Sequence, residues 1–407
     1  MRAFASVLAL GLIAAPGMAL AQEAPTAREL ARVDRILRQT PLIDGHNDVP
    51  WEIRDTYGND LDNVHLDGDT RTLTPPMHTS LDRLREGRVG GQFWSVYVPA
   101  SLKGADATRA VHEQIDLTRR MIARYSDRLE FADSADDIVR IHRRGRIASM
   151  FGMEGGEAID DNLAVLREFR ASGVLYMTLT HSANTDWVDS ATAAPAHGGL
   201  TPFGEDVVRE MNRVGMLVDL SHVSADAMRD ALRVATAPVI FSHSSAFALT
   251  PHPRNVPDDV LEMVRANGGV VMVNFYPGFV STEFWNWGAR RNGEEARLKS
   301  LNPADPAAVT TALDAWTVAN PAPLVNVSTV ADHVEHIGRV AGRAHVGIGA
   351  DYDGVPYLPV GLDGVEDYPA LLVELARRGW SDREIAAVAG GNVLRALRRA
   401  EEVAAGS

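Results

Sequence analysis

The chain has 407 residues, of which 45% are apolar and 23% are charged, and its formal net charge is −14. These values are ordinary for a globular protein, and the acidic balance argues against binding to nucleic acid or to an anionic membrane surface. The sequence contains no cysteine, which excludes disulfides, thiolate metal ligands and a thiol nucleophile.

Residues 1–21 have the pattern of a secretory signal peptide. Arg2 gives a positive start, residues 5–15 are apolar, and Ala19-Leu20-Ala21 resembles a cleavage site. We therefore expect an exported chain that is periplasmic or secreted after cleavage. No later run is long and apolar enough for a membrane span, so the mature chain should have no stable membrane anchor. Residues 22–407 contain no linker rich in proline, serine or charge and are predicted to form one domain.

Eight short apolar runs are predicted as β-strands, with helix-like segments between most of them. Continuous apolar strands that alternate with amphipathic helices indicate a parallel sheet with both faces covered. Eight such units favour an α/β fold of the (β/α)8 TIM-barrel type, and the absence of GxGxxG after the first strand disfavours a dinucleotide-binding fold. The predicted strands lie near residues 42–44, 92–98, 147–153, 174–179, 216–220, 239–242, 269–275 and 345–349. The predicted helices between and before them cover residues 26–38, 108–125, 162–170, 201–214, 224–234, 258–266 and 329–341.

Two long stretches, residues 51–80 and 280–327, do not follow this alternation. Both come directly after predicted strands, so we expect them to lie over the catalytic face as lids or rims. The last helix is predicted to start at Ser381, because Ser381 and Glu384 have the spacing of a capping box. Gly390-Gly391 interrupts this helix, which indicates close packing against the barrel.

His46 and Asp48 end the first predicted strand with the spacing His-x-Asp. Residues two apart in an extended chain project to the same side, so an imidazole and a carboxylate can grip one divalent ion. His65 and Asp67 have the same spacing but lie in a polar loop with no strand before them. We therefore predict metal binding for the first pair and not for the second. The two histidines of the helix 329–341 lie away from this face and are interpreted as structural.

Three further strands end in groups that could complete a metal site. Glu154 follows an apolar run and precedes two glycines, which would allow close approach to a metal. An acid that only stabilises a helix N-terminus is the alternative. His222 and His243 end consecutive strands, and neighbouring strands lie about 4.8 Å apart, so their imidazoles can converge on one ion. Each follows a serine, but no GxSxG elbow is present, so metal binding is favoured over a serine nucleophile.

His181, Asp351 and Arg254 are candidates for the reaction itself. His181 follows the fourth predicted strand and could be a fifth ligand, an oxyanion stabiliser or a structural histidine. Asp351 ends the last strand, where a carboxylate could shuttle protons, and Asp353 could take the same role. Arg254 lies in the loop after the sixth strand and could pair with a substrate carboxylate, or could be a solvated surface arginine.

Together these stretches resemble the membrane (renal) dipeptidase family of binuclear zinc peptidases, in its bacterial branch. The ordered set spans nearly all of residues 22–407 and is far more specific than any single motif. The chain differs from animal members in lacking cysteine and a lipid-anchor tail, and Glu157 stands where they carry a histidine. The matching stretches are Ile43-Asp44-Gly45-His46-Asn47-Asp48, Gly152-Met153-Glu154-Gly155-Gly156, Leu179-Thr180-His181-Ser182, Asp219-Leu220-Ser221-His222, Phe241-Ser242-His243-Ser244, His252-Pro253-Arg254-Asn255, Val273-Asn274-Phe275-Tyr276, Val346-Gly347-Ile348-Gly349 with Asp351 and Asp353, and Gly390-Gly391-Asn392.

The resemblance implies an exported zinc-dependent dipeptidase with two Zn²⁺ per chain. His46, Asp48 and Glu154 would hold one zinc ion. Glu154 would bridge to a second ion that is held by His222 and His243. A hydroxide that bridges the two metals would attack the peptide bond of a dipeptide.

The resemblance also implies roles around the substrate. His181 would face the scissile carbonyl, and Asp351 would contact the attacking water and the substrate amino group. Arg254 would pair with the substrate carboxylate, and Tyr276 would contact the same end. The family also suggests a homodimer, whereas acceptance of C-terminal D-residues is left open by the sequence.

Two other functions are compatible with parts of this pattern. An N-acyl-amino-acid hydrolase or a β-lactam hydrolase would use the same binuclear site, because each cleaves an amide close to a carboxylate. An exported binding protein without turnover is disfavoured, since all five implied metal ligands are present.

Overall fold

Eight parallel strands close into a barrel in the computed structural model, which describes residues 23–407. Each barrel strand pairs with the next one along the chain, and β1 pairs with both β2 and β9, which closes the ring. The (β/α)8 TIM-barrel prediction is confirmed, whereas the predicted signal peptide lies outside the described residues. The barrel strands are β1 (Leu42–Asn47), β2 (Val89–Ser95), β4 (Ile147–Glu154), β5 (Val174–Thr178), β6 (Leu217–Asp219), β7 (Ile240–Phe241), β8 (Val270–Val273) and β9 (Val346–Ile348).

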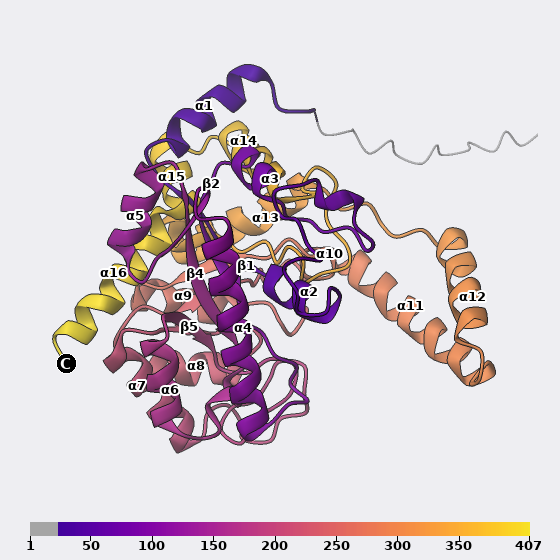
Figure 1. The fold of residues 1–407 in the computed structure, drawn as a ribbon, viewed down its shortest axis with the longest axis horizontal. Helices are drawn as coiled ribbons and strands as arrows, with labels where there is room; N and C mark the ends of the chain where they lie inside the picture. Colours follow the sequence, from indigo (N-terminus) through magenta and orange to yellow (C-terminus); the bar gives the residue numbers. More distant parts are fainter. Residues whose placement is uncertain (1–22) are drawn as a thin grey trace, which may run out of the picture.

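Helices surround the barrel, as Figure 1 shows. Every residue of the eight barrel strands is buried. This burial explains why the strands are continuous apolar runs rather than alternating ones. The helices are α1 (Ala27–Leu37), α2 (Val49–Asp55), α3 (Leu81–Glu86), α4 (Gly104–Arg124), α5 (Ala135–Arg143), α6 (Leu163–Ala171), α7 (Pro202–Val214), α8 (Ala225–Val234), α9 (Asp258–Asn267), α10 (Pro277–Val280), α11 (Thr282–Leu301), α12 (Pro306–Ala319), α13 (Val327–Ile337), α14 (Tyr368–Arg377), α15 (Asp382–Ala386) and α16 (Asn392–Ala405). Shorter helical turns cover Thr70–Thr72, Gly156–Ile159, Gly338–Gly342, Arg343–His345, Val365–Asp367 and Ala387–Gly391.

A short additional strand, β3 (Leu129–Phe131), pairs in parallel with β4 alone and lies outside the ring. The sequence does not predict it, because three residues are too few for a periodic signal. None of the helices within residues 23–407 combines the length and the hydropathy that crossing a membrane requires.

The two irregular stretches differ in how they relate to the catalytic end of the barrel. Residues 51–80 place Trp51 in the lining of the candidate pocket, as a rim should. Residues 280–327 instead form a helical hairpin of α11 and α12 that projects from the barrel (Figure 1) and contributes nothing to that lining. Only its base lies near the rim, where Phe284 and Trp287 pack against Tyr357. The expected lid is therefore not formed by most of the second stretch.

The capping box and the glycine pair that the sequence predicts near the C-terminus both have the expected structural roles. Ser381 and Glu384 form the predicted capping box, in which the Glu384 carboxylate accepts from the Ser381 N–H. A Cβ on Gly390 would lie 2.1 Å from the carbonyl oxygen of Pro41. The glycine is therefore required for the close contact between this segment and the start of β1.

Candidate metal centre and substrate pocket

The candidate ligands gather at the end of the barrel where its strands terminate. His46 lies in β1 and Glu154 is the last residue of β4. His222 and His243 follow β6 and β7, and Asp351 follows β9. Together with Asp48 and His181, these side chains form three overlapping groups, and the nitrogen and oxygen atoms within each group lie within 4.8 Å of one another. The parallel strands thus deliver all five to one place, as the carboxyl ends of barrel strands do in enzymes.

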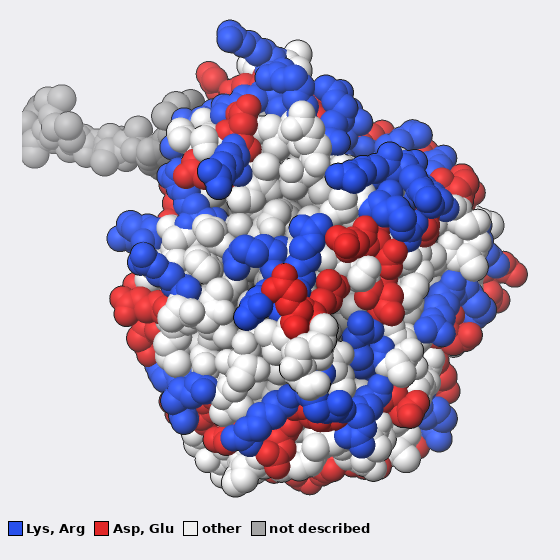
Figure 2. All heavy atoms as spheres, turned by 90° about the vertical axis from the view of Figure 1, so that its left-hand side faces the viewer, with Lys and Arg blue, Asp and Glu red and all other residues white. Residues whose placement is uncertain are grey.

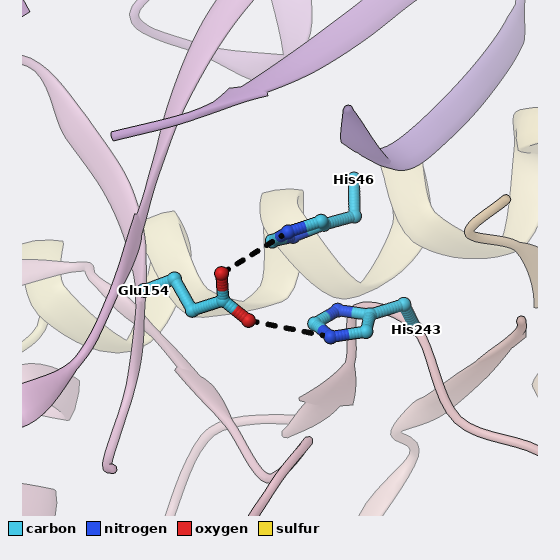
Figure 3. A group of neighbouring side chains, drawn as sticks. All are labelled: His46, Glu154 and His243. Atoms are coloured by element: carbon cyan, nitrogen blue, oxygen red, sulfur yellow. Dashed lines mark ion pairs between the residues drawn. The ribbon is translucent and has the colours of Figure 1, made fainter. Parts of the chain in front are cut away.

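The carboxylate of Glu154 lies between two pairs of candidate ligands. Its Oε2 is 3.4 Å from Nε2 of His46, and this nitrogen is 3.2 Å from Oδ2 of Asp48. Its Oε1 is 2.8 Å from Nε2 of His222 and 3.4 Å from Nε2 of His243. Figure 3 shows one oxygen directed at His46 and the other at His243. One carboxylate with a ligand pair on each side suits a site for two metal ions.

The Tyr176 hydroxyl determines which nitrogen of His46 is available to a metal. This hydroxyl donates to the carbonyl oxygen of Gly45 at 2.9 Å and lies 2.9 Å from Nδ1 of His46. Because its single proton is used, it must accept from an Nδ1–H. In the neutral ring Nε2 is then the nitrogen with a free lone pair, and it is buried without a hydrogen-bond partner. A neutral imidazole held in this way is the form that binds metals.

A second buried relay fixes His243 by the same logic. The Ser242 hydroxyl donates to Oδ2 of Asp219 at 2.6 Å and lies 2.8 Å from Nδ1 of His243. His243 must therefore donate from Nδ1. In the neutral ring Nε2 then carries no proton, and it faces Glu154. Ser242 is fully buried on the far side of the ring, so the serine-nucleophile alternative has no support in this geometry.

The electrostatics of the cluster favour a bound cation. Nε2 of His222 and Nε2 of His243 are 2.9 Å apart, and burial lowers the pKa of both histidines well below the ordinary value. Burial opposes protonation of His46 as well, yet Tyr176, Glu154 and Asp48 raise the pKa of His46 well above its ordinary value. The neutral imidazoles of His222 and His243, and the carboxylates that draw positive charge to His46, therefore suit divalent metal ions at this place.

Asp351 is held at the edge of this cluster. Its Oδ2 accepts from the Asn274 amide at 2.9 Å, and burial together with Asp48 and Glu154 raises the pKa of Asp351 to about 8. Its backbone has φ of 67°, as does that of His222. Left-handed conformations of non-glycine residues are costly and occur most often at functional sites.

Asp353, the alternative proton carrier, is directed elsewhere. Its Oδ1 accepts from the backbone N–H of His78 at 2.6 Å, and Asp353 does not line the pocket. Of the two candidates, Asp351 is the one that the structure brings to the cluster.

A cavity of about 400 Å³ lies above the cluster, which is within the usual size range of small-molecule sites. Arg254 is buried in its wall, with its guanidinium 5.3 Å from the centre of the Phe279 ring. Nε of Arg254 has no hydrogen-bond partner, and burial lowers the pKa of this residue to about 10. Such a cation suits a substrate anion, and the solvated-arginine interpretation is wrong. The lining consists of Asp48, Trp51, Tyr97, Glu154, His181, His222, His243, Arg254, Tyr276, Phe279, Asp351, Gly354, Val355 and Pro356.

His181 and Tyr276 also line this cavity. The His181 ring lies 4.3 Å from that of His222, its Nδ1 is buried without a partner, and burial lowers the pKa of His181. Tyr276 packs edge-on against Phe279 at the Arg254 side. The purely structural interpretation of His181 is therefore disfavoured, since a structural histidine would have its ring nitrogens satisfied.

Several residues that shape the site carry no separate signal in the sequence. Tyr176, Asp219 and Asn274 lie in or next to runs that are predicted only as strands. A polar residue inside an apolar strand is the one available hint. Conversely, His65 and Asp67 are exposed and belong to none of the ligand groups among the described residues.

Comparison with known proteins identifies relatives along most of the chain. The family model for membrane dipeptidase (peptidase family M19) matches residues 30–407. Dipeptidase 3 of Rattus norvegicus is 42% identical over 384 residues, which cover 93% of this chain and 68% of the rat protein.

Two solved structures share the fold. The probable dipeptidase PvdM from Pseudomonas aeruginosa has a TM-score of 0.76 at 22% identity, covering 92% of this chain and 99% of that chain. A metallo peptidase from Rhodobacter sphaeroides, solved with a phosphinate mimic of the dipeptide L-Ala-D-Ala, has a TM-score of 0.72 at 23% identity. That match covers 89% of this chain and 99% of the other.

Proposed function

Because the chain belongs to the membrane dipeptidase family, peptidase family M19, and is a metal-dependent hydrolase of the dipeptidase class, we propose that it cleaves dipeptides with a free C-terminal carboxylate at a site for two zinc ions. The position of the Glu154 carboxylate, between His46 on one side and His222 and His243 on the other, is the observation that carries this proposal.

His46, Asp48 and Glu154 would hold one ion, and Glu154, His222 and His243 would hold the other. When bound, such a pair supplies a hydroxide nucleophile at neutral pH and polarises the scissile carbonyl. The choice of zinc rests on the family and on the ligand set, because imidazole and carboxylate ligands suit zinc but also accept other divalent metals.

The other pocket residues would position the substrate and move protons. The Arg254 guanidinium would bind the C-terminal carboxylate, beside Tyr276. Asp351 would accept a proton from the attacking water and return it to the leaving amine. This role is supported by its position at the cluster and by a pKa that burial raises to about 8. His181 would donate a hydrogen bond to the carbonyl oxygen as negative charge develops on it.

We also propose that C-terminal D-residues are accepted. The support is the ligand of the Rhodobacter sphaeroides structure, whose mimicked dipeptide ends in D-Ala. Export is proposed from the pattern of residues 1–21 and would be tested by finding a mature N-terminus at Gln22 in the exported protein. A homodimer is proposed from the family resemblance and would be tested by light scattering.

The deciding experiment measures metal content and hydrolysis on the same purified protein. We expect about two zinc ions per chain together with cleavage of an L-L and an L-D dipeptide. An N-acetylated dipeptide and a β-lactam should be poor substrates. Metal binding without release of either dipeptide would favour the acyl-amide or β-lactam alternatives, and failure to bind zinc would refute the proposal.

A further inference from the structure

A second cavity, of about 450 Å³, opens at the end of the barrel opposite the catalytic pocket. It lies where β2 and β4 begin, between the C-terminal ends of α1 and α5 and the helix α3. β4 runs for eight residues from this cavity to Glu154, which separates the two sites by roughly 23 Å at the usual rise per residue. The mechanism makes no use of this end of the barrel.

The lining of this cavity is strongly basic in a chain that is acidic overall. Six arginines and a single carboxylate line it, although the whole chain has a formal net charge of −14. Figure 2 shows many Lys and Arg side chains, interspersed with Asp and Glu, on the side of the molecule that lies to the left in Figure 1. A concentration of guanidinium groups around one hollow raises the local affinity for anions. The charged lining residues are Arg38, Arg85, Arg88, Arg128, Arg143, Arg146 and Asp34.

Ion pairs with acidic residues on neighbouring helices explain the positions of only some of these arginines. Asp34 is shared by Arg38 and Arg88, and Asp82 is shared by Arg85 and Arg128. Sharing of this kind leaves guanidinium N–H groups over for a further acceptor, since each arginine carries five donors.

Arg143 takes no part in these ion pairs. Within residues 23–407 it has no ion pair or side-chain hydrogen bond, although Arg146 beside it pairs with Glu130. A guanidinium at the mouth of the cavity without an acidic partner is available to a ligand.

A further feature of the cavity is the backbone of Arg88. Arg88 has φ of 61°, a left-handed conformation that costs free energy in any residue other than glycine. Glycine would adopt this turn without strain, whereas the arginine places a guanidinium at the cavity, where it also pairs with Asp34.

We propose that this cavity binds the phosphate group of a phosphate ester, with Arg88 and Arg143 as its principal contacts. Guanidinium groups bind phosphate oxygens through pairs of parallel hydrogen bonds, and the higher charge and third oxygen of a phosphate ester let several arginines share it, which a carboxylate of single charge does not. The ester could be a soluble metabolite or the headgroup of an anionic lipid, and both present the same chemistry to the arginines.

The test uses glycerol 3-phosphate as the soluble ligand and phosphatidylglycerol vesicles as the lipid. Binding of the first is followed by ³¹P NMR titration of the metal-loaded enzyme, and binding of the second by co-sedimentation against vesicles of phosphatidylcholine alone. Arg88→Gly is the informative variant, because glycine relieves the left-handed backbone while it removes the guanidinium. Its lost ion pair with Asp34 is exposed and contributes little to folding.

We expect Arg88→Gly and Arg143→Gln each to weaken glycerol 3-phosphate binding at least tenfold while dipeptide hydrolysis stays unchanged. Arg109→Gln is the matched control, because Arg109 is an exposed arginine of α4 paired with Asp106 and lies outside the cavity. Saturable binding of glycerol 3-phosphate that is unchanged in Arg109→Gln supports the site. If the protein also binds the phosphatidylglycerol vesicles, and Arg88→Gly and Arg143→Gln weaken that binding, the lipid is identified as the source of the phosphate. Absence of saturable binding to both ligands, or equal weakening by the control, would overturn the proposal.

Discussion

The Tyr176 hydroxyl and Nδ1 of His46 lie 2.9 Å apart, fully buried beneath the candidate metal centre. The hydroxyl donates its one proton to the carbonyl oxygen of Gly45, so it can only accept a hydrogen bond from His46. A single phenol group thereby holds the imidazole in one tautomer and in one orientation. Gly152 leaves room for this phenol, since a Cβ there would lie 2.1 Å from Cζ of Tyr176.

Tyr176→Phe should therefore weaken metal binding while the fold is retained. The ring and its packing survive, but His46 loses the acceptor that fixes its tautomer. Loss of such an outer partner typically lowers metal affinity by about 10- to 100-fold. Chelator competition measures the affinity directly, and the absorption spectrum of the cobalt-substituted protein reports the ligand geometry.

Tyr125→Phe is the matched control for this prediction. Tyr125 is also buried, and its hydroxyl accepts from the backbone N–H of Leu66. Neither residue lines the pocket or belongs to a ligand group among the described residues. Its loss should lower stability without changing metal affinity. If both variants bound metal as tightly as the wild type, the tautomer argument for His46 would fail.

Arg254→Ala should raise KM for dipeptides far more than for the matching C-terminal amides. The guanidinium is 2% exposed and its Nε has no partner, so a substrate carboxylate would complete its hydrogen bonding. A charge-assisted contact of this kind contributes about 1.5–3 kcal/mol, which corresponds to roughly a 10- to 150-fold change. Steady-state kinetics on a dipeptide and its amide measure the difference, and equal losses on both would contradict carboxylate recognition by Arg254.

Asp351→Asn should lower kcat strongly and leave metal content close to that of the wild type. Asparagine keeps the shape of the side chain and can still accept from Asn274, but it cannot carry a proton. General acid–base groups typically contribute about 10²- to 10⁴-fold to the rate. Metal analysis and kcat are measured on the same sample. A variant that loses its metal would show instead that Asp351 is a ligand, and a variant with normal kcat would remove it from proton transfer.

The positions of the strands, and the gathering of the candidate ligands at their ends, could be predicted because both depend on local sequence. A strand buried on both faces must be apolar throughout, and a functional group at its end interrupts the run visibly, as Glu154 does after β4. Tyr176 could not be assigned a role in this way. An aromatic residue within an apolar strand is expected to be core, and only the closed barrel brings its hydroxyl to His46.

The helical hairpin of residues 280–327 escaped prediction for a different reason. α11 and α12 bury little more than a cluster of three side chains between them, so neither helix shows the continuous apolar face that marks a helix on a barrel. Helix α5 was missed although its buried residues Ala135, Ile138 and Ile141 recur every three positions, because it is only nine residues long. The hairpin, which packs away from the barrel, therefore leaves a weaker record in the sequence than the elements that pack on it.

His333 should make the fold less stable as the pH falls below neutrality. Its Nδ1 accepts from the backbone N–H of Ala246 at 3.0 Å, and its Nε2 lies 3.1 Å from the carbonyl oxygen of Val280. The side chain is thus satisfied only when neutral, and burial lowers the pKa of His333 to about 4. An unfolded chain would take up the proton near the ordinary histidine pKa of about 6.5.

The sign of the effect follows from where the protons bind. Between pH 6.5 and 4 the unfolded state holds more protons than the folded state, so stability is lost as the pH falls through this window and changes no further below it. This difference between the histidine pKa in the folded and unfolded states corresponds to roughly 3 kcal/mol in the free energy of unfolding. Urea unfolding of the wild type and of His333→Gln at several pH values measures the linkage. The glutamine variant should lack that part of the pH dependence, whereas His65→Gln, at an exposed position, should retain it. Identical pH profiles for the wild type and His333→Gln would show that His333 is not buried in neutral form.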